Sequence, residues 1–310
     1  VKVLVEGEEE VGSVNLSPLI QSRKAELSAD VALNGDSGIL RPDLPALVYG
    51  LRGLAYFEIR LQGPKQDLHS GVFGGSVHNP AQVLCELIAG MHDEHGRIML
   101  PGFYDQVRVL SDEEREELAR RPYSDTDWKQ AAGVTHLHGE AGFTTLERLG
   151  ARPTLEVNGL LSGFTEEGTK TVLPARAMAK ISMRLVPNQD DGEVERQLKD
   201  YMRQHVPEGL RWEVKMLARG PAMLVRRDTP GARAAARALQ DTFGVEPVWT
   251  LQGGSVPVVS MLKDALGIDS VLMGFGLPDD NFHSPNEKLH LPNYYRGIEA
   301  FIRFFENMAR

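Results

Sequence analysis

The sequence predicts an α/β protein with an inserted ferredoxin-like α+β unit. Toward both ends of the chain, apolar segments typical of buried strands alternate with amphipathic helical segments. In the middle, the elements follow the order strand, helix, strand, strand, helix, strand, which is the order of a ferredoxin-like unit. A chain of 310 residues is long enough for two domains of ordinary size. We therefore expect residues 1–47 and 248–310 to form one domain and residues 48–247 to form the inserted one.

The opening segment predicts two strands separated by a helix. The apolar run 1–5 is typical of a buried core strand, and neither an initiator methionine nor a polar lead-in precedes it. We therefore expect the chain to begin inside a domain. A helix is expected to start at Ser13 or Ser17, because serine caps helix N-termini. Residues 29–33 then predict a second strand, which ends at the loop that contains Asp36.

The inserted unit contains four segments typical of strands and two with the spacing of amphipathic helices. The expected strands are 54–61, 155–160, 177–186 and 210–217, and the expected helices are 80–91 and 192–205. Asp191 is the expected N-cap of the second helix. Residues 94–153 interrupt this order with a charged connection, which we expect to be a solvated excursion.

The last part of the chain returns to alternating helices and strands. The expected helices are 230–243, 256–266 and 293–308, and the expected strands are 248–251 and 270–275. Because this pattern matches the opening segment, we expect the smaller domain to be inserted into the larger one.

The composition argues against nucleic-acid and membrane partners. The formal net charge is -9 and the pI is about 5.5, with no clustered surplus of lysine and arginine of the kind that phosphate backbones require. No apolar stretch approaches the roughly 18 residues that a membrane-spanning helix needs. The lone cysteine, Cys85, lies in an apolar run and is expected to be a buried small hydrophobe. With no disulfide framework, the chain fits the cytoplasm.

Four carboxylates lie within five positions just after the first expected strand. They belong to Glu6 and Glu8–Glu10, and they repel one another unless cations lie among them. Asp36 and His283 also follow expected strands. Taken singly, these residues have ordinary explanations: a solvated turn, a turn-forming aspartate and an exposed loop histidine. Together, at strand ends of one sheet, they form a candidate zinc or manganese site, since these metals bind carboxylate oxygen and imidazole nitrogen.

Five motifs, taken in order, resemble those of one metallopeptidase family. They are EGEEEVGS at 6–13, DLHSGVFGGSVH at 67–78, RLVPN at 184–188, GGSVP at 253–257 and HSPNEK at 283–288. The family includes carnosinases, cytosolic non-specific dipeptidase, carboxypeptidase G and acetylornithine deacetylase, and the resemblance is closest to the cytosolic non-specific dipeptidase branch. It implies a metallopeptidase catalytic domain with an inserted lid and dimerisation domain. It also implies hydrolysis of dipeptides by water that two divalent metals, zinc or manganese, activate.

The resemblance implies a role for each residue of the candidate metal site. Glu9 corresponds to the general base, and Glu10, Asp36 and His283 correspond to metal ligands. The side chains of two adjacent residues diverge, so one can bind metal while its neighbour reaches the activated water.

Four further residues acquire roles only through the resemblance. His69 resembles the family histidine that reaches across a homodimer interface to the oxyanion, and Arg184 resembles the clamp for the substrate carboxylate. Thr171 and Ser255 would complete the pocket. Without the family, His69 is better explained as a residue that caps a turn, and Arg184 as one charged residue on an alternating strand.

One family feature is absent, which leaves alternative functions open. Family members carry an upstream His-x-Asp and a further bridging aspartate, and no His-x-Asp occurs in this sequence. We therefore expect an incomplete catalytic domain that is inactive by itself. The alternatives are a related amide hydrolase, such as an aminoacylase or deacetylase, and a catalytically inactive binding or dimerisation module. A glycosidase is disfavoured, because Glu9 and Glu10 are neighbours and that chemistry needs carboxyl groups about 5 Å or more apart across a sugar ring.

Overall fold

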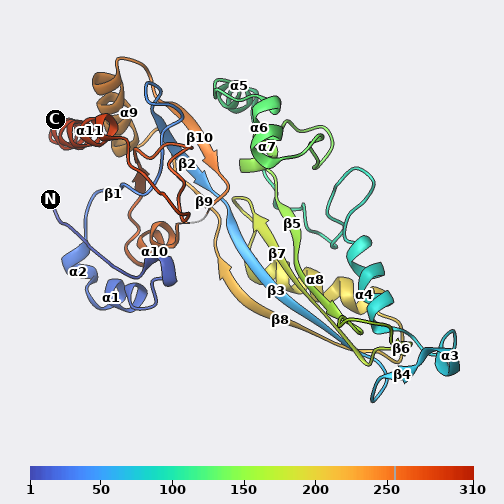
Figure 1. Cartoon of the computed structure of the whole chain (residues 1–310). Helices are drawn as coiled ribbons and strands as arrows, with labels where there is room; N and C mark the ends of the chain where they lie inside the picture. The colour runs from blue at the N-terminus through green and yellow to red at the C-terminus, as the bar shows by residue number, and fades with distance from the viewer. Residues whose placement is uncertain (255) are drawn as a thin grey trace.

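A computed structural model describes residues 1–254 and 256–310, which contain two main sheets (Figure 1). The first sheet has the order β1-β11-β2-β10, with β9 also paired to β2. Its strands are β1 (Ala32–Asn34), β2 (Ala46–Leu51), β9 (Met223–Leu224), β10 (Val248–Gln252) and β11 (Ser270–Leu272). The second sheet is antiparallel with the order β5-β7-β3-β8. Its strands are β3 (Gly53–Gln62), β5 (Thr154–Ser162), β7 (Arg176–Leu185) and β8 (Arg211–Gly220).

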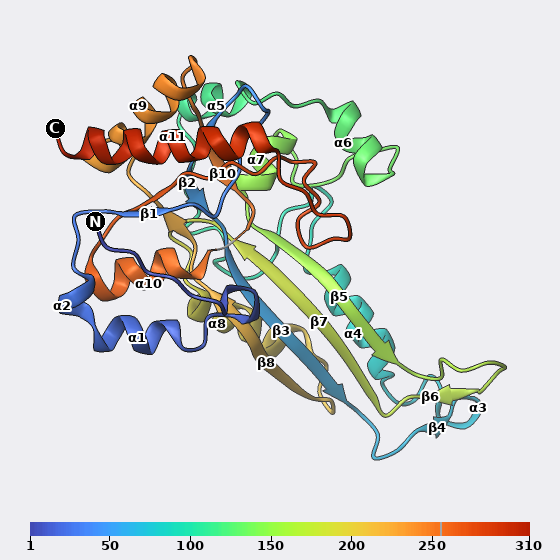
Figure 2. The same cartoon turned by 60° about the vertical axis from the view of Figure 1, so that its left-hand side comes forward.

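Helices cover both faces of the first sheet, as the α/β pattern predicts (Figure 2). The helices are α1 (Leu16–Ser22), α2 (Lys24–Leu27), α9 (Pro230–Phe243), α10 (Pro257–Leu266) and α11 (Leu291–Met308). Because successive residues of a strand point to opposite faces, Leu47 of β2 packs with α9 and α11, and Val48 packs with Val259 of α10. Phe304 of α11 lies at the centre of the first of these cores.

The second sheet is a ferredoxin-like unit with helices on one face only. Those helices are α4 (Pro80–Ala89) and α8 (Asp191–His205). Strand β7 shows the consequence, because alternate side chains from Ala177 to Leu185 are buried while Arg184 and its equivalents on the other face are half-buried. The strand order β5-β7-β3-β8 is that of the unit that the sequence predicts.

The two sheets are continuous through a narrow junction. Arg52 alone separates β2 from β3, and only Pro221 and Ala222 separate β8 from β9. Since β2 pairs with β9 and β3 pairs with β8, a two-stranded ribbon runs from one sheet into the other. At Gly53 the ribbon is too tight for a side chain, because a Cβ atom there would lie 2.6 Å from the Gly220 carbonyl oxygen.

A short two-stranded sheet forms the tip of the inserted unit, at the end of β3 remote from the junction (Figures 1 and 2). It pairs β4 (Leu68–His69) with β6 (Val172–Leu173), and α3 (Ser70–Phe73) follows β4.

The charged connection 94–153 packs against the first sheet, so the expectation of a purely solvated excursion is wrong. It contains α5 (Asp112–Ala119), α6 (Asp125–Ala132) and α7 (Thr145–Gly150). Leu118 and Ala151 are buried with Tyr49 and Leu251 of the sheet. The carboxylate of Glu117 accepts a hydrogen bond of 2.8 Å from the backbone N–H of Trp249. The acidic helix α5 thus buries Leu118 against the sheet, a contact that the charge pattern conceals.

Three further local predictions are wrong. Residues 1–5 form no strand ladder in the described part of the chain, and Val1, Val3 and Val5 are 95%, 82% and 82% exposed. A strand forms only where a neighbouring strand supplies hydrogen-bond partners, and the composition of a segment does not show whether there is one. Cys85 is exposed, because it lies on the outer side of α4. Asp190, not Asp191, caps α8, and its Oδ1 accepts from the Glu193 N–H at 2.8 Å.

The domain division at 47/48 and 247/248 remains a prediction. β2 runs past residue 47 and lies in the first sheet. α9 comes before residue 248 and packs against α11, beside that sheet.

Candidate active site

Glu9 and Glu10 begin a single 3-10 turn, Glu9–Val11, directly after the extended opening segment. The turn ends at Gly12, whose φ of 94° is in the left-handed region that favours glycine. Glu8 braces this turn, because its carboxylate accepts from the Asn15 backbone N–H at 3.1 Å and from Asn15 Nδ2 at 2.7 Å. Glu6 Oε1 accepts from the Ser13 hydroxyl at 3.2 Å. Two of the four carboxylates therefore have structural partners, and Glu9 and Glu10 remain available for chemistry.

Glu10 and His283 meet across the whole length of the chain. His283 Nε2 lies 2.9 Å from Glu10 Oε1, and the two side chains are 75% and 71% exposed. His283 lies in the loop between β11 and α11 and has a positive φ of 56°. An imidazole and a carboxylate in contact are a pair of zinc-type donors.

A buried aspartate that the sequence argument left without a role holds the His283 loop closed. Asp280 is 0% exposed, and its Oδ2 accepts from the Leu277 N–H at 2.7 Å. Lys288 closes the other side, since its N–H donates to the Asp280 carbonyl oxygen at 3.0 Å and its ammonium lies 3.5 Å from Asp280 Oδ1. The signal in the sequence was a Pro-Asp-Asp-Asn turn followed eight residues after Asp280 by a lysine, but nothing in it revealed burial.

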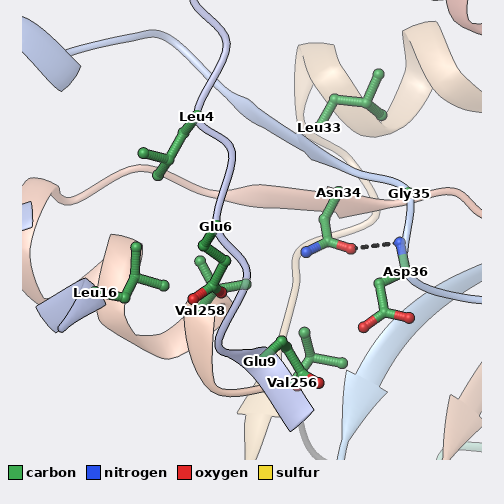
Figure 3. Close-up of a pocket in the computed structure, with 10 residues that line it drawn as sticks. All are labelled: Leu4, Glu6, Glu9, Leu16, Leu33, Asn34, Gly35, Asp36, Val256 and Val258. Carbon is green, nitrogen blue, oxygen red and sulfur yellow. Dashed lines mark hydrogen bonds between the residues drawn. The ribbon is translucent and has the colours of Figure 1, made fainter. Parts of the chain in front are cut away.

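Asp36 and Glu9 line one cavity of about 310 Å³ (Figure 3). Asp36 follows β1, and its N–H donates to Asn34 Oδ1 at 2.7 Å, which fixes the loop at the strand end. Glu6, Asn34 and Gly35 also line it, and the apolar part of the wall consists of Leu4, Leu16, Leu33, Val256 and Val258. The cavity therefore combines a polar rim with an apolar wall, as small-molecule sites do.

The pKa of Glu9 is raised above its ordinary value by partial burial and then by the negative charges of Asp36, Glu10 and Glu6. The positive charge of His283 opposes this shift. The charges of Asp36, Glu10, Glu6 and His283 are therefore close enough to Glu9 to affect its ionisation. A cation placed among them would relieve the repulsion.

The donor chemistry fits a divalent metal, but the ligand set is not closed. Within residues 1–254 and 256–310, no three histidine, cysteine, aspartate or glutamate side chains lie close enough together to hold a metal ion. The residues that could contribute ligands are Glu10, His283 and Asp36, with Glu9 beside them.

His69 of β4 and Thr171, next to β6, lie together at the tip of the inserted unit, and both views show this tip at the opposite end of the molecule from α1, the helix that follows the Glu9 turn (Figures 1 and 2). The Ser70 N–H donates to the Thr171 carbonyl oxygen at 3.1 Å. His69 is exposed, and its Nδ1 accepts from the Gly71 N–H at 3.0 Å, so it does cap a turn. One chain therefore does not bring His69 or Thr171 to the candidate metal residues.

Arg184 lies on β7, at the opposite end of the inserted unit, next to the junction. It pairs with Leu54 of β3 and Thr154 of β5, on the face without helices. Arg52 is close enough to be affected by its charge: burial lowers the pKa of Arg52 to about 10, with a further contribution from the charge of Arg184. Ser255 lies outside the described residues.

Residues 49–210 match the family described as peptidase dimerisation domain, M20. The chain belongs to the M20 peptidase family. The family resemblance and the fold class predicted from the sequence are thereby confirmed. As for the membrane, the M20 chain contains, within its described residues, no helix that is both long and apolar enough to span a bilayer.

Relatives and solved structures place the M20 chain among peptidases. The Cys-Gly metallodipeptidase dug1 of Schizosaccharomyces pombe is 34% identical over 310 residues, which cover 98% of this chain and 65% of the relative. The human Beta-Ala-His dipeptidase is 32% identical, with coverage of 100% and 62%. The crystal structure of the M20 family metallo-carboxypeptidase Sso-CP2 from Sulfolobus solfataricus has a TM-score of 0.84 at 32% identity, with coverage of 98% and 69%. The chain thus spans a little under two thirds of these curated relatives.

Proposed function

We propose that the protein to which this chain belongs is a metal-dependent dipeptidase. The observation that carries the proposal is the contact between Glu10 and His283 beside Glu9, a carboxyl group with a raised pKa. The dipeptidase names of relatives more than 30% identical over nearly the whole chain support the substrate class. The supporting residues are few and specific, so the proposal can be tested one residue at a time.

Glu10, Asp36 and His283 would hold two divalent metal ions, zinc or manganese, together with ligands from elsewhere in the protein. Such ions lower the pKa of water and polarise the scissile carbonyl group. Glu9 takes a proton from the attacking water and returns it to the leaving amine, as a general base and then a general acid.

Substrate recognition is assigned to the inserted unit. Arg184 would bind the free carboxylate of the dipeptide, because a guanidinium fork makes two parallel hydrogen bonds to a carboxylate. Thr171 and Ser255 would complete the pocket. His69 would stabilise the oxyanion of a second subunit, so a homodimer through the inserted unit is part of the proposal. The match of residues 49–210 to a dimerisation domain supports that assembly, and we propose the cytoplasm as its location.

A metal reconstitution with a substrate panel tests the proposal. The full-length protein is stripped with a chelator, reloaded with zinc or manganese, and assayed on dipeptides, N-acyl amino acids and C-terminally amidated dipeptides. We expect metal-dependent hydrolysis of free dipeptides above all others. Preference for N-acyl amino acids would instead support an aminoacylase or deacetylase, and binding without turnover would support an inactive module.

A further inference from the structure

Arg52 is a buried arginine at the one position that separates β2 of the first sheet from β3 of the second. It lies between β2 and β3 and is 8% exposed. No carboxylate among the described residues pairs with it, although a buried charge is costly unless it is neutralised or well hydrogen-bonded. Its hydrogen bonds go instead to backbone carbonyl groups on both sides of the junction.

The guanidinium of Arg52 connects the two units directly. Nε donates to the Gly253 carbonyl oxygen at 3.3 Å, in the turn after β10 of the first sheet. Nη1 lies 3.5 Å from the carbonyl oxygen of Arg148 in α7, which packs against the first sheet, and 3.5 Å from that of Arg152, two residues before β5 of the second sheet. The Arg52 backbone N–H donates to the Gln252 carbonyl oxygen at 3.2 Å. Two further chain segments, 148–152 and 252–253, therefore meet at Arg52, at the point where the first sheet passes into the second.

Position 253 has no room for a side chain beside Arg52. A Cβ atom at Gly253 would lie 2.6 Å from Arg52 Nη2 and 3.1 Å from the Leu149 carbonyl oxygen. The turn can approach the guanidinium only because it has no side chain at this position. An arginine is required on the other side, because its planar fork carries five donors, whereas a lysine ammonium is a single point of charge.

The same guanidinium lies within electrostatic range of Arg184, so the two cations repel. Glu156 of β5 attracts Arg52 and partly offsets that repulsion. Arg184 is tied to Arg52 through the sheet, because it pairs with Leu54 of β3, two residues after Arg52.

We propose that Arg52 is a positioning residue that braces the junction and so fixes Arg184 relative to the turn after β10. The positioning role rests on the proposed dipeptidase function, whereas the brace itself is independent of it. Loss of the guanidinium should let the two units vary in orientation. A free substrate carboxylate should then be bound less well, while an amidated substrate, which does not need Arg184, should be affected less.

A distance measurement tests the brace. Cys85, the one cysteine of this sequence, is exposed on α4 of the inserted unit, and Glu306→Cys adds a second exposed label site on α11, with any cysteine elsewhere in the full-length protein replaced by serine. Spin labels at both sites, in full-length protein diluted with unlabelled protein, report the distance between units by electron paramagnetic resonance. We expect a narrow distribution in the parent protein and a broadened or shifted one in Arg52→Met, with Arg52→Lys in between.

Two further variants keep the result interpretable. Arg60→Met removes an exposed arginine of the same strand β3, whose Nε donates to Glu58 at 2.6 Å, and should leave the distribution unchanged. Gly253→Ala keeps the charge of Arg52 but displaces its guanidinium, and should reproduce the broadening even if Arg52→Met folds poorly. Parent-like distributions in both Arg52→Met and Gly253→Ala would overturn the proposal.

Steady-state kinetics test the consequence for Arg184. In Arg52→Met, we expect kcat/KM for a free dipeptide to fall about tenfold, mainly through KM, with a smaller fall for the amidated one. Equal falls on both substrates would overturn the positioning role. If the parent protein hydrolyses no dipeptide, the proposed function fails, and the label distances alone decide whether Arg52 braces the junction.

Discussion

His283 Nε2 lies 2.9 Å from Glu10 Oε1, although 273 positions separate the two residues. The contact joins the turn at the start of the chain to the loop before α11. Glu9 precedes Glu10 in the chain, and its carboxyl group is not part of this contact. We therefore expect the two adjacent glutamates to have different roles.

Glu9→Gln and Glu10→Ala should therefore have different effects. Glu9→Gln should keep the metal content and lower kcat about 100-fold or more, because a general base typically contributes that much. Glu10→Ala should lose metal, because it removes a proposed metal ligand. Metal content by mass spectrometry and kcat, with Glu26→Gln as the exposed control, check both. Normal turnover in Glu9→Gln would assign the base to another residue.

Replacing Asp280 by asparagine should weaken metal binding without touching a proposed ligand. Asp280→Asn removes the charge that attracts Lys288 and loosens the loop that carries His283. Residues that orient ligands typically contribute about 10-fold to 100-fold in metal affinity. A zinc competition titration measures the change, with Asp264→Asn on α10 as the control. An unchanged affinity would show that the loop keeps its shape without Asp280.

Complementation tests whether His69 serves a second subunit. His69→Ala and Glu9→Gln should each be nearly inactive. Mixing and reassembling them in equal amounts should restore about a quarter of the parental activity, since half of the dimers are mixed and each has one intact site. Activity that stays absent after verified subunit exchange would place His69 in the site of its own chain.

Arg184→Lys should selectively impair free dipeptides. Lysine cannot reproduce the two parallel hydrogen bonds to a carboxylate, so kcat/KM should fall about 10-fold to 100-fold. Hydrolysis of C-terminally amidated dipeptides should barely change. Arg60→Lys, on the neighbouring strand, serves as the control. Equal losses on the two substrates would show that Arg184 supports the fold instead.

The stability of the packed connection should depend on the ionisation of Glu114. Burial disfavours the charge of Glu114, but hydrogen bonds from Arg108, Ser111 and Tyr49 outweigh it and hold its pKa below the ordinary 4.5. The same carboxylate, after burial, contributes to raising the pKa of Tyr49 to about 12. The charged form of Glu114 therefore stabilises the folded state above pH 4.5, and this contribution is lost as the pH falls through the lowered pKa.

Glu114→Gln should accordingly destabilise the protein by about 2 kcal/mol at pH 7, and the difference from the parent protein should vanish in acid. Urea unfolding at several pH values measures it. Glu116→Gln, exposed on the same helix, should have little effect at any pH. A difference that stays constant down to the acid limit would mean that packing, not charge, is responsible.

The sequence predicts most elements of this fold because their periodicity reflects burial. Strand β7 alternates because helices cover one face, and α9 and α11 have apolar stripes because they pack on each other and on the sheet. Strands β4, β6 and β9 have only two residues each, which is too short for any period to show. Residues 1–5 have the composition of a strand, but pairing depends on a neighbour.

The candidate site is predictable to the extent that strand ends mark it. Glu9, Asp36 and His283 follow expected strands, and the structure places them in one electrostatic field. Arg52 and Asp280 escaped prediction for a common reason. The partners of Arg52 are backbone carbonyl groups, and those of Asp280 are a backbone N–H and a lysine eight positions away. Contacts with backbone groups leave no trace in a sequence.

The ribbon that joins the two sheets acts as a fulcrum. Links of a single residue at Arg52 and of two residues at Pro221 and Ala222 leave no slack, because each residue spans at most about 3.6 Å. The units can therefore swing but not slide apart. Strand β3 is a lever of 10 residues, about 33 Å, so a swing of about 10° moves its far end by about 6 Å. Arg184, beside the fulcrum, turns through the same angle, which tilts its guanidinium fork, but it is displaced far less than His69 at the other end. If His69 serves the partner subunit, each swing in one chain moves the oxyanion-stabilising histidine of the other chain's active site.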